Sequence, residues 1–146
     1  MGEKYDSLKL ENQLCFPLYA CSREIIKKYR PYLEKIDLTY TQYITMMVFW
    51  EHKKISVKEL GKKLFLDSGT LTPVLKSLEA KGFVTRYRSQ EDERVLLVEI
   101  TESGEALKER ASEVPAKIGN CITLTPDEAK SLYGILYKLL GQQEEK

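Results

Sequence analysis

The chain has 146 residues, of which 42% are hydrophobic and 31% are charged, with 23 lysines and arginines against 22 aspartates and glutamates. The hydrophobic content excludes a disordered protein, and the length suits one domain that can bury a core. No apolar run approaches the roughly 20 residues that cross a bilayer, and no signal sequence is recognised. We therefore expect a cytoplasmic protein without a membrane partner.

Cysteine and histidine usage argues against a metalloprotein and against a secreted disulfide framework. The cysteines are Cys15, Cys21 and Cys121, which form neither a CxxC pair nor a cysteine–histidine cluster. The single histidine, His52, is expected to cap the end of a helix. The sequence therefore predicts no metal and no cofactor.

The N-terminal part is predicted to be a helix. Its apolar residues recur at helical spacing as far as Tyr29-Arg30-Pro31, where the proline disfavours continuation. Asn12 is the expected cap, which places Cys15 in the first turn, where the positive end of the helix dipole stabilises an anion. Pro17 indicates a later start or a kink at this point.

Residues 39–82 are predicted to hold three more helices, of which the last two form a helix-turn-helix. Thr39 with Gln42, and Ser56 with Glu59, have the spacing of capping boxes at two helix starts. The third helix covers Asp67–Glu79 and ends before Gly82. Its apolar face is formed by Leu71, Val74, Leu75 and Leu78. The opposite face is polar, as in a helix that enters a DNA groove, and carries Ser68, Thr72 and Lys76.

The next segment is predicted to be a β-hairpin, or wing, with strands over 83–89 and 95–101. Arg86 and Arg88 share one strand face. Asp92 stands two residues before Arg94 and is placed to hold that arginine extended, ready for a narrow minor groove.

The net charge of the whole chain does not indicate a nucleic-acid partner, but the local charge of residues 52–94 does. Residues 52–94 contain ten basic and six acidic side chains, a net charge of +4, which leaves thirteen basic and sixteen acidic elsewhere, a net charge of −3. We expect double-stranded operator DNA as the partner. The residues expected to contact it are Ser68, Thr70, Thr72, Lys76, Arg86, Arg88, Asp92 and Arg94.

The C-terminal part is again predicted to be helical. One helix begins at Thr101 and is bent or interrupted at Pro115, and a last helix begins at Thr125 and ends at Gly141. The terminal helices carry more apolar surface than a small winged domain can cover, which favours a homodimer. The predicted fold is mainly α with a small β wing: one domain over 1–146, with dimerisation helices at 1–38 and 102–146 around a winged helix-turn-helix at 39–101.

This order of elements, with Asp92-Glu-Arg94 in the wing and Thr101-Glu-Ser-Gly104 after it, resembles the MarR family of dimeric bacterial regulators. The segments that resemble its organic-hydroperoxide-sensing OhrR branch are Leu10-Glu-Asn-Gln-Leu-Cys-Phe16, Tyr19, Tyr29, Thr39-Tyr40 and Leu66-Asp-Ser-Gly-Thr-Leu-Thr-Pro73. The resemblance implies a repressor that leaves DNA when Cys15 is oxidised by organic hydroperoxide. It also implies a thiol pocket to which the partner subunit's Tyr29 and the partner subunit's Tyr40 contribute.

Helical geometry is compatible with such a pocket. Cys15, Tyr19 and Tyr29 fall on one stripe of the first helix, so Tyr19 is also expected to line the pocket, but Cys15 and Tyr29 are about 21 Å apart along the helix. Two copies that cross antiparallel near Ser22 would bring Cys15 against the partner subunit's Tyr29. The alternative is that Cys15 is a small buried hydrophobic residue.

Some members of that branch use a second cysteine, near the junction of the last two helices, for a disulfide between subunits. Cys121 stands at that place, and the resemblance implies that it forms the disulfide with Cys15. Cys21 lies about 9 Å along the axis from Cys15 and on another face, beyond disulfide reach within one helix. The alternative for Cys121 is a free thiol in a loop.

Two other functions are compatible with parts of this sequence. A thiol peroxidase would use Cys15 and Cys121 in turnover, but no arginine or histidine lies near Cys15 in the sequence to activate peroxide, so we expect no enzyme. A MarR-type repressor released by a small aromatic ligand would make Cys15 incidental.

Overall fold

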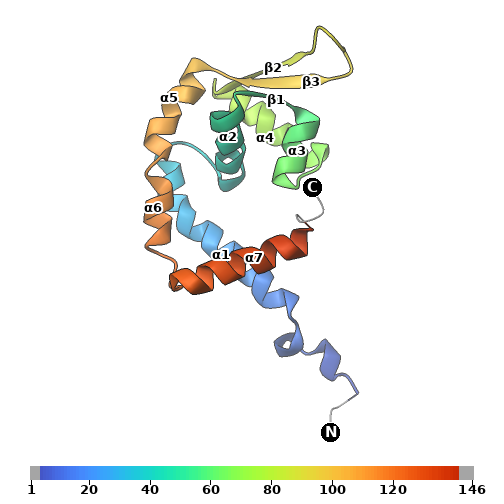
Figure 1. The fold of residues 1–146 in the computed structure, drawn as a ribbon, viewed down its shortest axis with the longest axis vertical. Coiled ribbons are helices and arrows are strands. Elements are labelled where there is room, and N and C mark those ends of the chain that lie inside the picture. Colours follow the sequence, from blue (N-terminus) through green and yellow to red (C-terminus); the bar gives the residue numbers. More distant parts are fainter. Residues whose placement is uncertain (1–3, 142–146) are drawn as a thin grey trace. The chain divides into compact units, whose positions relative to one another are not determined.

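The computed structural model describes residues 4–141, which form two compact units, 4–115 and 116–141, each described here by itself. The chain is mainly helical with a small antiparallel β-sheet, as the sequence predicts, and this sheet has three strands (Figure 1). The predicted single domain over 1–146 stays a prediction. The unit boundary falls inside the range 102–146 that was assigned to dimerisation.

The first unit begins with two short 3-10 turns, η1 (Asp6–Leu8) and η2 (Leu10–Asn12), followed by the helix α1 (Cys15–Glu34). The prediction that Asn12 caps α1 is wrong, because its Nδ2 donates instead to the carbonyl of Asp6 at 2.7 Å. Cys15 is nevertheless in the first turn. Pro17 is accommodated there because amides of the first turn have no acceptor within the helix.

The predicted end of α1 at Pro31 is also wrong. The helix continues through Pro31 to Glu34 and carries Leu33, which is only 2% exposed, into the core. Ile36 and Leu38, just beyond it, are buried as well. Burial of these side chains offsets the amide hydrogen bond that proline removes, which local propensity does not anticipate.

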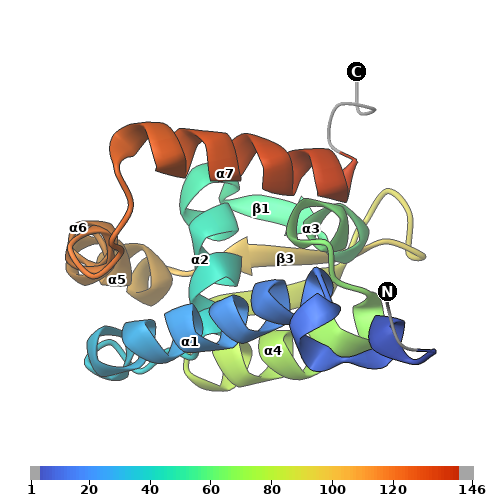
Figure 2. The same ribbon diagram turned by 90° about the horizontal axis from the view of Figure 1, so that it is seen from below.

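The helix α2 (Tyr40–His52) lies in the middle of the unit (Figure 2). Its start is the predicted capping box: the Gln42 amide donates to the Thr39 hydroxyl at 3.2 Å, and the Thr39 amide donates to Gln42 Oε1 at 3.0 Å. His52 is its last residue, and Lys53 ends the helix with a positive φ of 65°.

The predicted helix-turn-helix is formed by α3 (Val57–Leu64) and α4 (Ser68–Ala80). Ser56 and Asp67 cap the two helices by accepting from the amides of Glu59 and Thr70. The turn between the two helices folds back so closely on α3 that a Cβ on Gly61 would lie 2.7 Å from the carbonyl oxygen of Leu66.

The wing is formed by β2 (Val84–Arg88) and β3 (Leu96–Ile100), within one residue of the predicted strands. A third strand, β1 (Lys54–Ser56), was not predicted, because three residues carry too little pattern to indicate a strand. It pairs antiparallel with β3, with Ile55 opposite Val98, so the sheet order is β1-β3-β2.

The core of the first unit lies between α2, α3, α4 and the sheet. Its most deeply buried apolar side chains are Leu33, Met46, Phe49, Leu60, Leu71, Leu75, Leu78, Val84 and Val98. The helix α5 (Glu102–Ala111) follows β3 and is joined to α2 where the Trp50 indole donates to the carbonyl of Gly104 at 2.9 Å.

The helix α6 (Val114–Gly119) crosses the boundary between the units, and a short break separates it from α5 just before Pro115, as predicted. The second unit contains α7 (Pro126–Leu140), which has a full capping box between Thr125 and Glu128 and ends at Gly141 with φ 77°. The exposed large apolar residues of α7 are Leu132, Tyr133, Ile135, Tyr137, Leu139 and Leu140.

Gly104 provides a test of the packing between α5 and the sheet. A Cβ at this position would lie 2.4 Å from the carbonyl oxygen of Phe83 and 2.7 Å from Ile100 Cγ1. We therefore expect Gly104→Ala to lower the free energy of unfolding by about 1–3 kcal/mol, measured by urea denaturation. Gly69→Ala is the control, since its Cβ would meet only Asp67 Oδ1 at 3.5 Å. Equal stability of the two variants would contradict this packing.

Candidate functional site

The candidate DNA-binding surface is centred on α4. Leu71, Leu75 and Leu78 hold one face of this helix in the core, each no more than 1% exposed. Asp67 caps the N-terminus, where the amide of Thr70 donates to Oδ1 at 2.8 Å and lowers the pKa of the carboxyl. The apolar face of α4 is therefore held against the core, and the opposite face is exposed to solvent.

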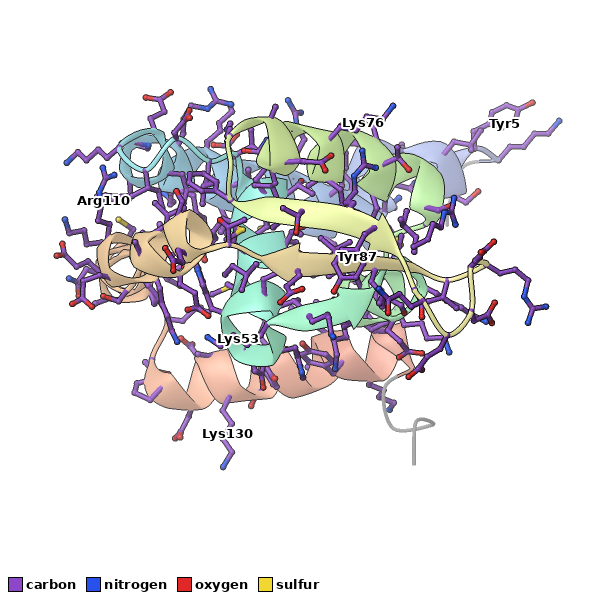
Figure 3. All side chains as sticks on the ribbon, turned by 90° about the horizontal axis from the view of Figure 1, so that it is seen from above. Tyr5, Lys53, Lys76, Tyr87, Arg110 and Lys130 are labelled. Carbon is purple, nitrogen blue, oxygen red and sulfur yellow. The ribbon has the colours of Figure 1, made fainter. Side chains whose placement is uncertain are left out.

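That free face carries the predicted polar stripe. Ser68 and Thr70 are exposed, and the Thr72 hydroxyl donates to the carbonyl of Ser68 at 2.8 Å. Lys76 is exposed and extends away from the helix (Figure 3). The helix continues through Pro73 without interruption.

The tip of the wing carries the predicted pair of Asp92 and Arg94. Arg94 Nε and Nη2 donate to the two carboxylate oxygens of Asp92 at 3.0 and 3.1 Å, and the Arg94 amide donates to the same carboxylate. These hydrogen bonds hold the pKa of Asp92 below its ordinary value. The Arg94 side chain is 91% exposed, so its guanidinium is oriented by Asp92 but remains accessible.

The two arginines of β2 differ in their surroundings. Arg86 Nε and Nη2 each lie 3.0 Å from Oε1 of Glu79 on α4, and the Arg86 side chain is only 22% exposed. Arg88 is exposed. Arg86 thus joins the wing to α4, a role that the sequence did not indicate because its partner lies across a turn.

A cluster of three tyrosine rings lies at the contact between α1 and α2. Tyr29 meets Tyr40 edge-on with ring centroids 4.8 Å apart, and Tyr43 lies 5.8 Å from Tyr29 and 6.3 Å from Tyr40. The sequence indicated Tyr29 and Tyr40 but missed Tyr43, although it follows Tyr40 by three residues, one helical turn.

Burial governs the ionisation of this tyrosine cluster. It raises the pKa of Tyr29 and of Tyr40, and it raises the pKa of Tyr43 to about 12, with smaller contributions from the neighbouring phenols. The three phenols therefore keep their protons at neutral pH and can donate hydrogen bonds to an anion.

Cys15 lies at the other end of α1 from Tyr29. Its thiol is exposed, and so is Tyr19, whose ring lies 5.5 Å from the Arg23 guanidinium carbon. Within one chain, Cys15 and Tyr19 are thus on the same helix as Tyr29 but are not gathered around the tyrosine cluster. The exposed large apolar side chains nearest Cys15 in the sequence are Leu10, Leu14, Phe16 and Leu18.

The other two cysteines differ in exposure. Cys21 is exposed on α1. Cys121 is partly buried in the second unit, just after α6, where its amide donates to the carbonyl of Ile118 at 2.9 Å. The predicted position of Cys121 between two helices is confirmed, and its pairing stays a prediction.

Residues 4–141 contain neither a candidate metal site nor a candidate membrane span. This part of the chain has no group of three or more histidine, cysteine or acidic side chains placed to hold a metal ion. Nor does any helix within it combine the length and apolar character needed to cross a membrane.

Comparison with known proteins identifies the family. The family model for the transcriptional regulator SarA/Rot matches residues 24–111. The organic hydroperoxide resistance transcriptional regulator of Bacillus subtilis is 48% identical over 146 residues, 100% of this chain and 99% of the relative. The chain belongs to the MarR family of transcriptional regulators. The relatives of this MarR-family protein are transcriptional regulators and not enzymes, in agreement with the prediction.

Solved structures agree with this assignment. AbfR of Staphylococcus epidermidis, solved in reduced and overoxidised forms bound to DNA, is 35% identical and has a TM-score of 0.77 over 97% of this MarR-family chain and 99% of its own. A mutant MarR from E. coli complexed with operator DNA is 27% identical, with a TM-score of 0.81 over 95% of this chain and 99% of its own. The winged helix of this MarR-family protein is therefore the fold of DNA-bound regulators.

Proposed function

We propose that this protein is a redox-responsive repressor: a homodimer binds operator DNA and is released when Cys15 is oxidised by an organic hydroperoxide. The observation that carries the proposal is the exposed Cys15 in the first turn of α1, in a chain 48% identical over its full length to an organic hydroperoxide resistance regulator.

The DNA-binding half of the proposal is supported by α4 and the wing. The α4 stripe of Ser68, Thr70, Thr72 and Lys76 has the short polar and basic side chains that contact base edges and phosphates in a major groove. Arg94, held extended by Asp92, is suited to the adjacent minor groove. Arg88 is free for phosphate, whereas Arg86 already has Glu79 as its partner.

The homodimer is supported by surface that one chain leaves uncovered. Large apolar side chains are exposed on η1, η2 and the first half of α1, and again on α7. The N-terminal segment extends away from α2, α3 and α4 of its own unit (Figure 1). Monomeric proteins rarely expose so much apolar surface, and a second copy is the partner that covers it by symmetry.

The dimer also completes the thiol site. Fourteen residues of helix separate Cys15 from Tyr29, about 21 Å, so only the partner subunit's Tyr29 can reach the thiol. The protonated phenols of that cluster would donate hydrogen bonds to a Cys15 thiolate. The thiolate sulfur attacks the terminal oxygen of the hydroperoxide, the O–O bond breaks, and the alkoxide takes up a proton and leaves as an alcohol. Cys15 is thereby oxidised to sulfenic acid.

A second step follows if a thiol reaches the sulfenic acid. We infer that Cys121 from the other subunit attacks it, forming a disulfide and releasing water. AbfR, which is similar over 94% of this chain, has also been solved with a disulfide formed. Closing such a bond would pull α1 of one subunit toward the segment after α6 of the other. This movement would change the spacing of the two winged helix-turn-helix regions of the dimer.

Arg94 tests the DNA-binding half. Because its side chain is 91% exposed, Arg94→Ala should leave thermal unfolding unchanged while weakening operator binding by about 1–3 kcal/mol in fluorescence anisotropy. Glu93→Ala, at an exposed neighbouring position, is the matched control and should not weaken binding. Unchanged affinity of Arg94→Ala would remove the wing tip from the interface.

Cys15 tests the sensing half. Cys15→Ser should bind operator as the wild type does but should no longer be released by cumene hydroperoxide, because serine keeps the size and lacks the nucleophile. Cys21→Ser should be released normally. Release of the Cys15→Ser protein by hydroperoxide would show that another group is the sensor, and its release by an aromatic ligand would favour a ligand-binding repressor.

Cys121 tests the second step. Wild-type protein treated with cumene hydroperoxide should run as a covalent dimer on a non-reducing gel and return to monomer with dithiothreitol. Cys121→Ser should remain monomeric, whereas Cys21→Ser should still cross-link. A covalent dimer that persists in Cys121→Ser and disappears in Cys21→Ser would transfer the role to Cys21.

A further inference from the structure

The buried side chain of Gln42 connects the start of α2 with the C-terminal end of α4. Gln42 is only 7% exposed, and both the oxygen and the nitrogen of its side-chain amide form hydrogen bonds. Oε1 accepts from the Thr39 amide at 3.0 Å and from Lys81 Nζ at 2.9 Å, and Nε2 donates to the Ser77 hydroxyl at 2.8 Å. Thr39 belongs to the cap of α2, whereas Ser77 and Lys81 lie on α4 and at its C-terminal end.

The same turn of α2 carries the tyrosine cluster. Tyr40 is the first residue of the helix and meets the Tyr29 ring at 4.8 Å, while Tyr43 lies one turn further on. The backbone that positions Tyr40 is therefore the backbone whose cap is closed by Gln42. A rotation of this first turn moves the Tyr40 ring and the Gln42 amide together.

Lys81 extends this network to the loop between α1 and α2. Its Nζ donates to the carbonyl of Asp37 at 2.5 Å and lies 3.7 Å from the carboxylate of the same residue. Asp37 has a positive φ of 60°, so the loop is held in a backbone conformation that few residues adopt. The loop, the α2 cap and the end of α4 thus share hydrogen bonds through Gln42 and Lys81.

Hydrogen bonds of this kind restrict α4 in a way that its apolar contacts do not. Leu71, Leu75 and Leu78 hold α4 against the core, but apolar contacts are non-directional and tolerate small rotations. A buried amide that loses its partner incurs a desolvation penalty, so the Gln42–Ser77 bond makes α4 follow the first turn of α2.

We propose that Gln42 is a positioning residue that couples the tyrosine cluster to the DNA-reading helix α4. When the surroundings of Tyr40 change, the first turn of α2 rotates, and the bond from Gln42 to Ser77 carries that rotation to α4. This inference rests on the proposed sensing at Cys15 for its biological use, since the cluster is the expected partner of that thiol. The coupling itself is a property of the reduced protein.

The coupling is tested first without any oxidant. Operator affinity of the reduced full-length protein is measured for Tyr40→Ala, Ser77→Ala and the double variant. Ser77→Ala removes the α4 end of the contact and leaves the Thr39–Gln42 cap intact. We expect the effect of Tyr40→Ala on affinity to shrink about fivefold or more in the Ser77→Ala background. In the Ser77→Thr background, which keeps the hydroxyl, the effect should stay as in the wild type. Independent effects of Tyr40→Ala and Ser77→Ala would overturn the proposal.

A second measurement separates coupling from support of the fold. After cumene hydroperoxide treatment, Cys15 oxidation is followed by mass spectrometry, and operator affinity is compared before and after. Ser77→Ala should oxidise at the wild-type rate. Its loss of operator affinity on oxidation should nevertheless be at least about fivefold smaller than that of the wild type. A wild-type loss of affinity in fully oxidised Ser77→Ala would show that Gln42 only supports the fold. If the wild type itself keeps its operator affinity when Cys15 is oxidised, the sensing proposal fails. The comparison of Tyr40→Ala, Ser77→Ala and the double variant in the reduced protein then decides the coupling by itself.

Discussion

The first unit depends on the burial of α2. This helix contacts α1, α3, α4, α5 and the strands β1 and β3, and its side chains Met46 and Phe49 are fully buried. Trp50 adds a directional constraint, because its indole must find an acceptor once buried and finds it in the carbonyl of Gly104. Elements that are far apart in the sequence therefore take their positions from one central helix. The candidate DNA-binding helix α4 and the tyrosine cluster lie against different parts of α2.

Some side chains around α4 hold the helix in place, and others on its exposed face remain available to a binding partner. Its apolar face, its cap at Asp67 and its contacts to Gln42 and Arg86 are satisfied within the protein. Ser68, Thr70 and Lys76 remain exposed. A rigid helix with an unsatisfied polar face suits sequence reading, because little conformational entropy is lost when DNA binds. The same argument applies to Arg94, which Asp92 orients in advance.

The proposed thiol site has the opposite character, because one chain supplies its parts without assembling them. Cys15 is exposed among exposed apolar side chains, and the tyrosine cluster is partly buried at the far end of the same helix. Assembly in a second copy would make the site depend on the relation between subunits. In the proposed mechanism, oxidation there would change the spacing of the two winged helix-turn-helix regions and, through Gln42, the orientation of each α4.

The sequence by itself determined the features that depend on neighbours within about four residues. These include the helix starts at Thr39, Ser56, Thr101 and Thr125, the two faces of α4, the stops at Gly82 and Gly141, and the Asp92–Arg94 pair. Only the tertiary structure decided that α1 continues past Pro31, that β1 joins the sheet, that Arg86 pairs with Glu79, and that Tyr43 completes the cluster with Tyr29 and Tyr40. It also decided that Gln42, recognisable as a cap residue, reaches Ser77 and Lys81. Caps and turns are stabilised by local hydrogen bonds that spacing reveals, whereas these other features depend on burial and pairing between residues that only the folded chain brings together.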